Sequence, residues 1–172
     1  MILIGISGKK RSGKDTFADF IIENARGIAV KRSFADALKD EAAQVLNISR
    51  ERIESEKSFF RPFLQWYGTE WRRGCFGGDY WIRQLKQRIE LSAAHVIVVP
   101  DVRFRNEADL IRDMGGMVVR VERIGESHED RHASETDLDG CPADTLITAE
   151  SGDTEALRVN AAWLIDKLQE RK

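Results

Sequence analysis

The sequence is poor in cysteine and proline. Its 172 residues contain two cysteines and three prolines. Two cysteines, Cys75 and Cys141, are too few for a disulfide framework, and their spacing is not that of a zinc site. We therefore expect a protein of a reducing compartment whose fold depends on a hydrophobic core.

Long hydrophobic runs and an excess of basic charge are also absent. The segment from Met1 to Ser7 has no basic region and only a short apolar run, so we expect neither a signal peptide nor a spanning helix there. Lys and Arg number 27 against 29 Asp and Glu, a net charge of −2 that disfavours coating of nucleic acid. These absences predict a cytoplasmic protein that binds neither membrane nor nucleic acid.

Short apolar runs alternate along the chain with amphipathic stretches. The runs occupy residues 2–6, 27–30, 96–99, 117–121 and, more weakly, 145–148. The stretches between them have apolar residues at helical spacing, such as Trp81, Leu85 and Ile89. Alternation of this kind predicts a three-layer α/β domain over residues 1–172, with about five parallel strands and helices on both faces of the sheet.

Two segments interrupt the alternation. Residues 48–81 are helix-like, aromatic and rich in arginine, and they predict an inserted helical lobe over about residues 36–81. Residues 123–141 are polar and aperiodic, which is typical of a lid loop. A disordered surface loop is the alternative interpretation of the second segment.

The strongest motif follows the first apolar run. Gly8, Gly13 and Lys14 match the GxxxxGK pattern of a phosphate-binding P-loop, between a predicted strand and a predicted helix. Backbone N–H groups and the helix N-terminus of such a loop surround a phosphate, and the lysine supplies a point charge. The predicted nucleotide-binding residues are Gly8, Lys9, Lys10, Arg11, Ser12, Gly13, Lys14, Asp15 and Thr16. A glycine-rich turn without a ligand is the alternative.

The residue after Lys14 departs from the usual pattern. Asp15 stands where most P-loops have a Ser or Thr that binds Mg²⁺, and the hydroxyl follows at Thr16. A carboxylate also binds Mg²⁺, directly or through water, so both residues are candidate metal ligands.

Another candidate group follows the apolar run at 96–99. Ligands bind at the carboxyl ends of strands in open parallel sheets, so Asp101 should face the P-loop, as a candidate to bind Mg²⁺ directly or to bond to one of its ligands. Capping of the following helix is an alternative role for Asp101. Arg103 is a candidate for holding a phosphoryl group, because arginine binds phosphate oxygens in a bidentate manner.

Aromatic, amide and guanidinium side chains are concentrated between residues 61 and 73. Aromatic rings stack on nucleobases, arginine holds phosphate, and Gln or Glu bonds to base edges. This mixture predicts a mononucleotide pocket. Its candidate residues, with those near the second apolar run, are Phe34, Asp36, Lys39, Arg61, Gln65, Trp66, Glu70, Arg72 and Arg103. Trp71 and Trp81 are interpreted as core residues, and Arg131 and His132 as lid residues.

Six segments resemble the deoxynucleoside monophosphate kinases of tailed bacteriophages. They are Ile6–Thr16, Phe34–Lys39, Leu64–Glu70, Phe76–Trp81, Asp101–Glu107 and His132–Glu135, and they occur in family order over most of the chain. The loop ending in Gly-Lys-Asp is shared with other small kinases, such as phosphomevalonate kinases. The segments between Leu64 and Glu107 favour the phage deoxynucleoside monophosphate kinases over these other small kinases.

The resemblance implies an NMP-kinase-like fold, ATP and Mg²⁺ as the donor side, and a deoxynucleoside monophosphate (dNMP) as acceptor. The implied catalytic residues are Lys14, Asp101, Arg103 and Arg131, and the implied metal ligands are Asp15, Thr16 or Asp101. A phage-encoded enzyme of this kind would supply deoxynucleotides for phage DNA replication in the host cytoplasm. A homodimer is compatible with the sequence.

Two other functions remain open from the sequence. One is a small-molecule kinase of the same fold that acts on phosphomevalonate or dephospho-coenzyme A. The other is a P-loop ATPase module that acts on a protein partner. The Asn-Lys-x-Asp tetrad of GTPases does not occur in the sequence.

Overall fold

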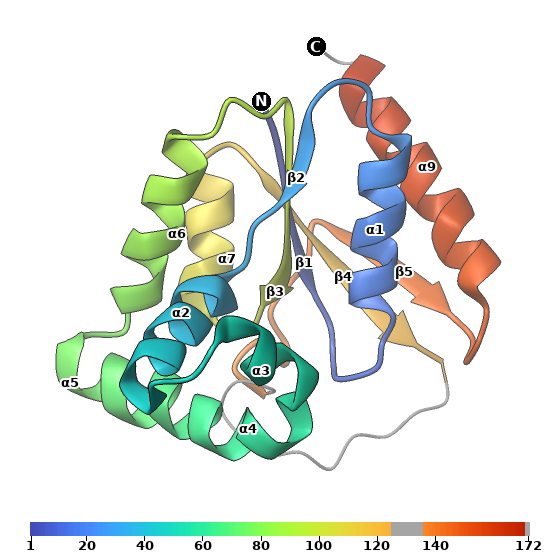
Figure 1. The fold of residues 1–172 in the computed structure, drawn as a ribbon. Helices are drawn as coiled ribbons and strands as arrows, with labels where there is room; N and C mark the ends of the chain where they lie inside the picture. The colour runs from blue at the N-terminus through green and yellow to red at the C-terminus, as the bar shows by residue number, and fades with distance from the viewer. Residues whose placement is uncertain (125–135, 171–172) are drawn as a thin grey trace.

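The computed structural model describes residues 1–124 and 136–170. Figure 1 shows a central sheet with helices on both faces. The strands are β1 (Ile2–Ser7), β2 (Ala29–Lys31), β3 (Val96–Val102), β4 (Met117–Arg123) and β5 (Thr145–Ala149). The helices are α1 (Lys14–Asn24), α2 (Phe34–Leu46), α3 (Arg50–Ser55), α4 (Lys57–Gln65), η1 (Trp66–Arg73), α5 (Gly74–Phe76), α6 (Tyr80–Glu90), α7 (Arg105–Asp113) and α9 (Thr154–Glu170).

The five strands form one parallel sheet in the order β2-β3-β1-β4-β5. Central β1 pairs with β3 on one side, where Ile4 lies opposite Val98, and with β4 on the other, where Ile4 lies opposite Met117. The predicted three-layer α/β fold and its parallel sheet are therefore confirmed. The carboxyl ends of β1 and β3, which the sequence marked as the ligand side, lie next to each other at the centre of the sheet.

Side chains on the two faces of the sheet build separate cores. Ile2, Ile4 and Ile6 of β1 pack against α1 and α9, because alternate strand residues point to the same face. Leu3 points to the opposite face and packs with α6 and α7. The prediction that Trp81 is a core residue is confirmed, since it is 3% exposed.

The helices between β2 and β3 add a third core on one side of the sheet. Ala42 of α2, Ile53 of α3 and Phe60 of α4 pack together in this cluster. The helical run begins at Phe34, two residues before the expected start of the lobe, because Ser33 caps α2 with its side chain.

The segment Trp66–Arg73 is a π-helix, which the sequence analysis did not predict. Its wider turn carries Trp71 to the surface, where that residue is 44% exposed and stacks on Trp66 with ring centroids 6.0 Å apart. The interpretation of Trp71 as a core residue was therefore wrong. Inside the turn, the indole N–H of Trp81 donates to the carbonyl of Gly68 at 2.9 Å.

Across residues 1–124 and 136–170, no helix has both the length and the apolar character needed to cross a bilayer.

Candidate active site

The loop between β1 and α1 is shaped by two glycines. Gly13 has a left-handed backbone (φ +92°) at the N-cap of α1, which a residue with a Cβ adopts only at a cost. A Cβ at Gly8 would lie 2.4 Å from the carbonyl oxygen of Val121 and 2.5 Å from Oγ of Ser12. The chain therefore passes close to β4 before it turns, and the backbone N–H of Ser12 donates back to the carbonyl of Lys9 at 3.1 Å.

Polar groups inside this loop suit an anionic ligand. Lys14 is 8% exposed, and its Nζ lies 3.4 Å from the carbonyl oxygen of Lys9, so the side chain folds back over the loop. Oγ of Ser12 is buried and has no hydrogen-bond partner among the described residues. Buried hydroxyls are nearly always bonded, so this group is ready to bond to a ligand in the loop.

One cavity of about 470 Å³ joins this loop to the helices between β2 and β3. The P-loop side of the cavity is formed by Lys10, Arg11, Lys14 and Asp15, and the helical side includes Lys39, Lys57, Arg61 and Gln65. Asp101 and Arg103 line it from the end of β3. Its volume is that of a typical small-ligand site, and its wall carries cations at both ends.

Ten of the predicted site residues line this cavity: Lys10, Arg11, Lys14, Asp15, Phe34, Lys39, Arg61, Gln65, Asp101 and Arg103. Lys39 reaches it while paired with Glu54, with Nζ and Oε1 2.6 Å apart. Residues far apart in sequence thus meet at the carboxyl end of the sheet, as expected for an open parallel sheet.

Four predicted acceptor residues do not line the cavity. Trp66 is 50% exposed and stacks on Trp71, on the outer side of η1. Glu70 is also exposed. The sequence predicted that both contact the acceptor, but the π-helical turn directs them away from the cavity.

The other two residues, Asp36 and Arg72, are engaged in contacts that hold helices together. Asp36 accepts a hydrogen bond from the backbone N–H of Ser33 in a capping box and pairs with Arg50 at 3.0 Å. Arg72 pairs with Glu41 at 2.7 Å, and its guanidinium lies about 5 Å from the ring centroids of Tyr67, Phe76 and Tyr80. Both residues stabilise the packing of α2 against its neighbours.

The carboxylate of Asp101 binds the first turn of α2. It accepts hydrogen bonds from the backbone N–H groups of Phe34 at 3.1 Å and Ala35 at 2.8 Å, and from the hydroxyl of Ser33. The predicted alternative role, capping of the following helix α7, was wrong, because the N-cap of α7 is Phe104. Asp101 instead fixes the start of α2 at the cavity wall.

The residues present fit a metal ion that is bound mainly by phosphate and water. The described residues contain no group of three His, Cys, Asp or Glu side chains placed to hold a metal. Mg²⁺ in kinase sites needs only one or two protein carboxylates beside the phosphate oxygens. Asp15 is exposed at the cavity and suits direct binding, whereas the oxygens of Asp101 already accept three hydrogen bonds.

Two cavity residues, Arg73 and Glu107, were not among the predicted site residues. They form an ion pair in which the side chains are 10% and 3% exposed. Burial raises the pKa of Glu107 to about 7, while Arg73 and two backbone N–H groups act in the opposite direction. Glu107 ends one of the six segments that resemble the family, Asp101–Glu107. That segment alone did not indicate that the carboxylate would be buried.

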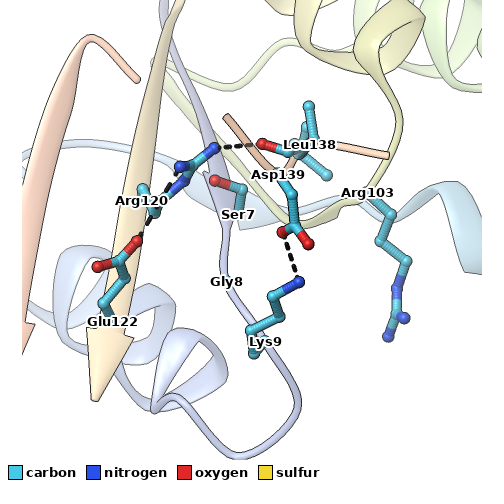
Figure 2. A pocket seen from close by; sticks show the side chains of 9 residues that line it. Ser7, Gly8, Lys9, Arg103, Arg120, Glu122, Leu138 and Asp139 are labelled. Atoms are coloured by element: carbon cyan, nitrogen blue, oxygen red, sulfur yellow. Dashed lines mark hydrogen bonds and ion pairs between the residues drawn. The ribbon is translucent and has the colours of Figure 1, made fainter. Parts of the chain in front are cut away.

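A smaller hollow of about 60 Å³ lies beside the P-loop (Figure 2). Lys9 pairs there with Asp139 at 2.5 Å, and Arg120 donates to the carbonyl of Leu138 at 2.8 Å. Arg103 lines this hollow as well as the large cavity. The last part of the predicted lid, around Leu138 and Asp139, is therefore held against the P-loop and β4.

Two of the remaining expectations concern the lid. Arg131 and His132 lie outside the described residues, so their roles stay predictions.

A family model and two relatives that match this chain are all described as deoxynucleotide monophosphate kinases. The family model described as deoxynucleotide monophosphate kinase matches residues 2–60 and 44–159. A protein of Acanthamoeba polyphaga mimivirus, assigned as a deoxynucleotide monophosphate kinase, is 32% identical over 164 residues, which covers 80% of this chain and 82% of the relative. The deoxynucleotide monophosphate kinase of Enterobacteria phage T4 is 25% identical, over 86% of this chain and 92% of the relative.

Solved structures share the fold at low sequence identity. A sugar kinase from Janibacter sp. HTCC2649 aligns with a TM-score of 0.54 at 16% identity, over 96% of this chain and 95% of that one. A protein from Chloroflexus aurantiacus assigned as a kinase aligns with a TM-score of 0.53 at 16% identity, over 98% and 96%. The family model extends over most of the chain and the mimivirus relative over four fifths of it, so the chain belongs to the deoxynucleotide monophosphate kinase family and is a phosphotransferase.

Proposed function

We propose that the chain transfers the γ-phosphoryl group of ATP to a dNMP in a Mg²⁺-dependent reaction in the cytoplasm. The observation that carries the proposal is that one cavity of about 470 Å³ has a P-loop at one end and cationic helices at the other. Phosphoryl transfer requires two anions to be aligned, their repulsion reduced and water excluded. One cavity with cations at both ends meets the first two requirements.

The donor phosphates belong on the P-loop. The glycines leave room for a phosphate, and Lys14 and the hydroxyl of Ser12 can bond to it. Mg²⁺, when bound, would neutralise part of the phosphate charge, and Asp15 is the residue suited to hold it. Thr16 and Asp101 remain candidates for contact through water.

The acceptor belongs at the helical side. Lys57 and Arg61 offer positive charge to its phosphate, and Gln65 and Thr69 offer polar groups to its base. Apolar contact would come from Leu38, Leu64 and Trp81, which line the same cavity. Arg103 enters from the end of β3 and is the candidate to stabilise charge on the transferring group.

The family assignment supports a deoxynucleoside monophosphate acceptor over phosphomevalonate and dephospho-coenzyme A. A coupled ADP-release assay, run with each dNMP separately and without acceptor, tests the proposal. We expect ADP release that depends on at least one dNMP. ADP release at the same rate without acceptor would instead indicate an ATPase.

Substitution of the P-loop lysine links this activity to the cavity. Lys14→Met keeps the buried aliphatic stem and removes the charge, so we expect an intact fold and a fall in kcat of at least a hundredfold. Lys86→Met is the matched control, because Lys86 is exposed on α6 beside Glu90 and does not line the cavity. Near wild-type kcat in Lys14→Met would contradict the proposed donor site.

A further inference from the structure

Glu107 occupies an unusual position for a carboxylate. Within residues 1–124 and 136–170 it is the only buried acidic residue, 2% exposed, and it lies at the wall of the large cavity. Acidic side chains are almost never fully buried unless they are paired. The burial of Glu107 must therefore be explained by the groups that bind its carboxylate.

The two carboxylate oxygens of Glu107 bind different parts of the chain. Oε1 accepts from the guanidinium of Arg73 in η1. Oε2 accepts from the backbone N–H groups of Arg103 at 2.8 Å and Phe104 at 3.1 Å, in the loop that leaves β3. One carboxylate thus connects the helices between β2 and β3 to the loop that carries Arg103.

Arg73 is held from several sides. Its guanidinium lies over the ring of Phe104, 3.9 Å from the centroid, and Nη1 donates to the carbonyl of Gly78 at 2.8 Å. With Glu107 as a third partner, both the plane and the direction of the guanidinium are fixed. Arg73 and Arg103 both line the cavity.

We infer that Glu107 is a positioning residue: it fixes Arg73 and the Arg103 loop relative to each other, so that two guanidinium groups from separate elements form one wall facing the transferring phosphoryl group. The inference rests on the proposed function and assigns a role in it to Arg73 and Glu107. A helix-capping role alone would need only Oε2, because a capping box is completed by the backbone N–H contacts. The contact between Oε1 of Glu107 and Arg73 is not needed for capping and therefore indicates a second role.

Glu107→Gln separates the two roles. The amide oxygen of Gln can still accept from the backbone N–H groups, but its NH₂ then faces the donor group of Arg73, and the charge that holds Arg73 is lost. Misplacement of a positioning group by about 1 Å costs about a hundredfold in rate. We expect kcat for the best dNMP to fall about a hundredfold and the KM for ATP to stay within about threefold.

Glu41→Gln is the matched control. Glu41 pairs with Arg72, the neighbour of Arg73, and anchors the same π-helix to α2, but neither Glu41 nor Arg72 lines the cavity. Thermal unfolding of both variants measures the structural cost. We expect Glu41→Gln to lower the melting temperature and leave the kcat of the folded enzyme within about threefold of wild type.

Arg73→Lys provides a second route if Glu107→Gln folds poorly. Lysine keeps the charge but cannot bond to Glu107 and Gly78 while stacking on Phe104, so we expect a similar fall in kcat and little further loss in the double variant. Arginine side-chain ¹H–¹⁵N spectra give a readout independent of turnover, in which the Arg73 guanidinium resonances broaden or average in Glu107→Gln.

The outcomes are distinct. Wild-type kcat in both Glu107→Gln and Arg73→Lys, or an equal fall in kcat in Glu41→Gln, overturns the inference and leaves the proposed function standing. Unchanged Arg73 resonances in Glu107→Gln also overturn it. A wild-type protein that phosphorylates no dNMP overturns the proposed function, and this inference with it.

Discussion

At the scale of single residues, the local backbone decides which arginine of η1 faces the cavity. Arg72 and Arg73 are neighbours in sequence, yet Arg72 is surrounded by aromatic rings and Glu41 while Arg73 lines the cavity. Residue type alone predicted a phosphate-binding role for Arg72. The direction of each side chain depends on the π-helical turn, which the sequence did not reveal.

Substitutions of Arg61 and Trp66 test whether only residues that line the cavity bind the acceptor. Arg61 lines the cavity and Trp66 does not, so Arg61→Ala should raise the KM for dNMP about tenfold or more, whereas Trp66→Ala should change it less than about threefold. Steady-state kinetics with dNMP as the varied substrate measure both. A large KM effect in Trp66→Ala would mean that the base stacks on the outer face of η1.

Glu107 predicts a pH dependence of stability. Because its pKa in the folded protein is about 7, above the ordinary value of 4.5, the folded state binds more protons than the unfolded state between these values. The contribution of Glu107 to the free energy of unfolding therefore falls as the pH rises through this window, by about 3 kcal/mol in total.

Glu107→Gln supplies the reference, since glutamine does not titrate. Urea unfolding of both proteins from pH 4.5 to 8 should show the stability of wild type relative to the variant decreasing up to about pH 7 and level above it. A relative stability that increases with pH would show that Arg73 lowers the pKa of Glu107 more than burial raises it.

At the scale of elements, the first strand, loop and helix were the most predictable part of the site. The apolar run of β1, the GxxxxGK spacing and the amphipathic α1 follow each other without interruption, and the structure has them in this order. Strand ends were less predictable. β3 extends to Val102 and includes Pro100 and Asp101, because pairing with β1 continues beyond the apolar run, with a shift in register.

The short distance between Gly8 of the P-loop and β4 predicts that a side chain at this position disturbs ATP binding. A Cβ at Gly8 meets backbone at 2.4 Å, so Gly8→Ala must displace the loop, and we expect the affinity for ATP to fall at least tenfold. Gly152→Ala is the control, because φ is +85° there and no atom lies within 4 Å of the added Cβ. It should cost about 1 kcal/mol of stability and leave ATP binding unchanged.

Calorimetric ATP titration and thermal unfolding measure the two effects. If Gly8→Ala binds ATP like wild type, the donor phosphates do not occupy this loop.

At the scale of the whole molecule, the order of the strands brings the site together. β1 and β3 are adjacent at the centre of the sheet, so the P-loop and the Asp101–Arg103 segment meet. The sequence predicted this meeting from the general behaviour of parallel sheets. It did not predict that Asp101 would bind the start of α2, since that contact joins residues 66–68 positions apart.

The segment between β2 and β3 shows the limit of prediction at this scale. Its composition predicted a nucleotide pocket, and Arg61 and Gln65 do line the cavity. Its own small core of Ala42, Ile53 and Phe60 is specified by contacts between helices rather than by any one of them. Which aromatic residues face inward could therefore not be derived from spacing alone.

The central claim is that one cavity holds donor and acceptor together. Calorimetric titration with a bisubstrate analogue, adenosine joined through five phosphates to the preferred deoxynucleoside, tests it most directly. We predict one site per chain and a Kd at least a hundredfold below that of the dNMP alone, with at least tenfold weaker binding in both Lys14→Met and Arg61→Ala. Binding no tighter than that of ATP, and unaffected by Arg61→Ala, would contradict the claim.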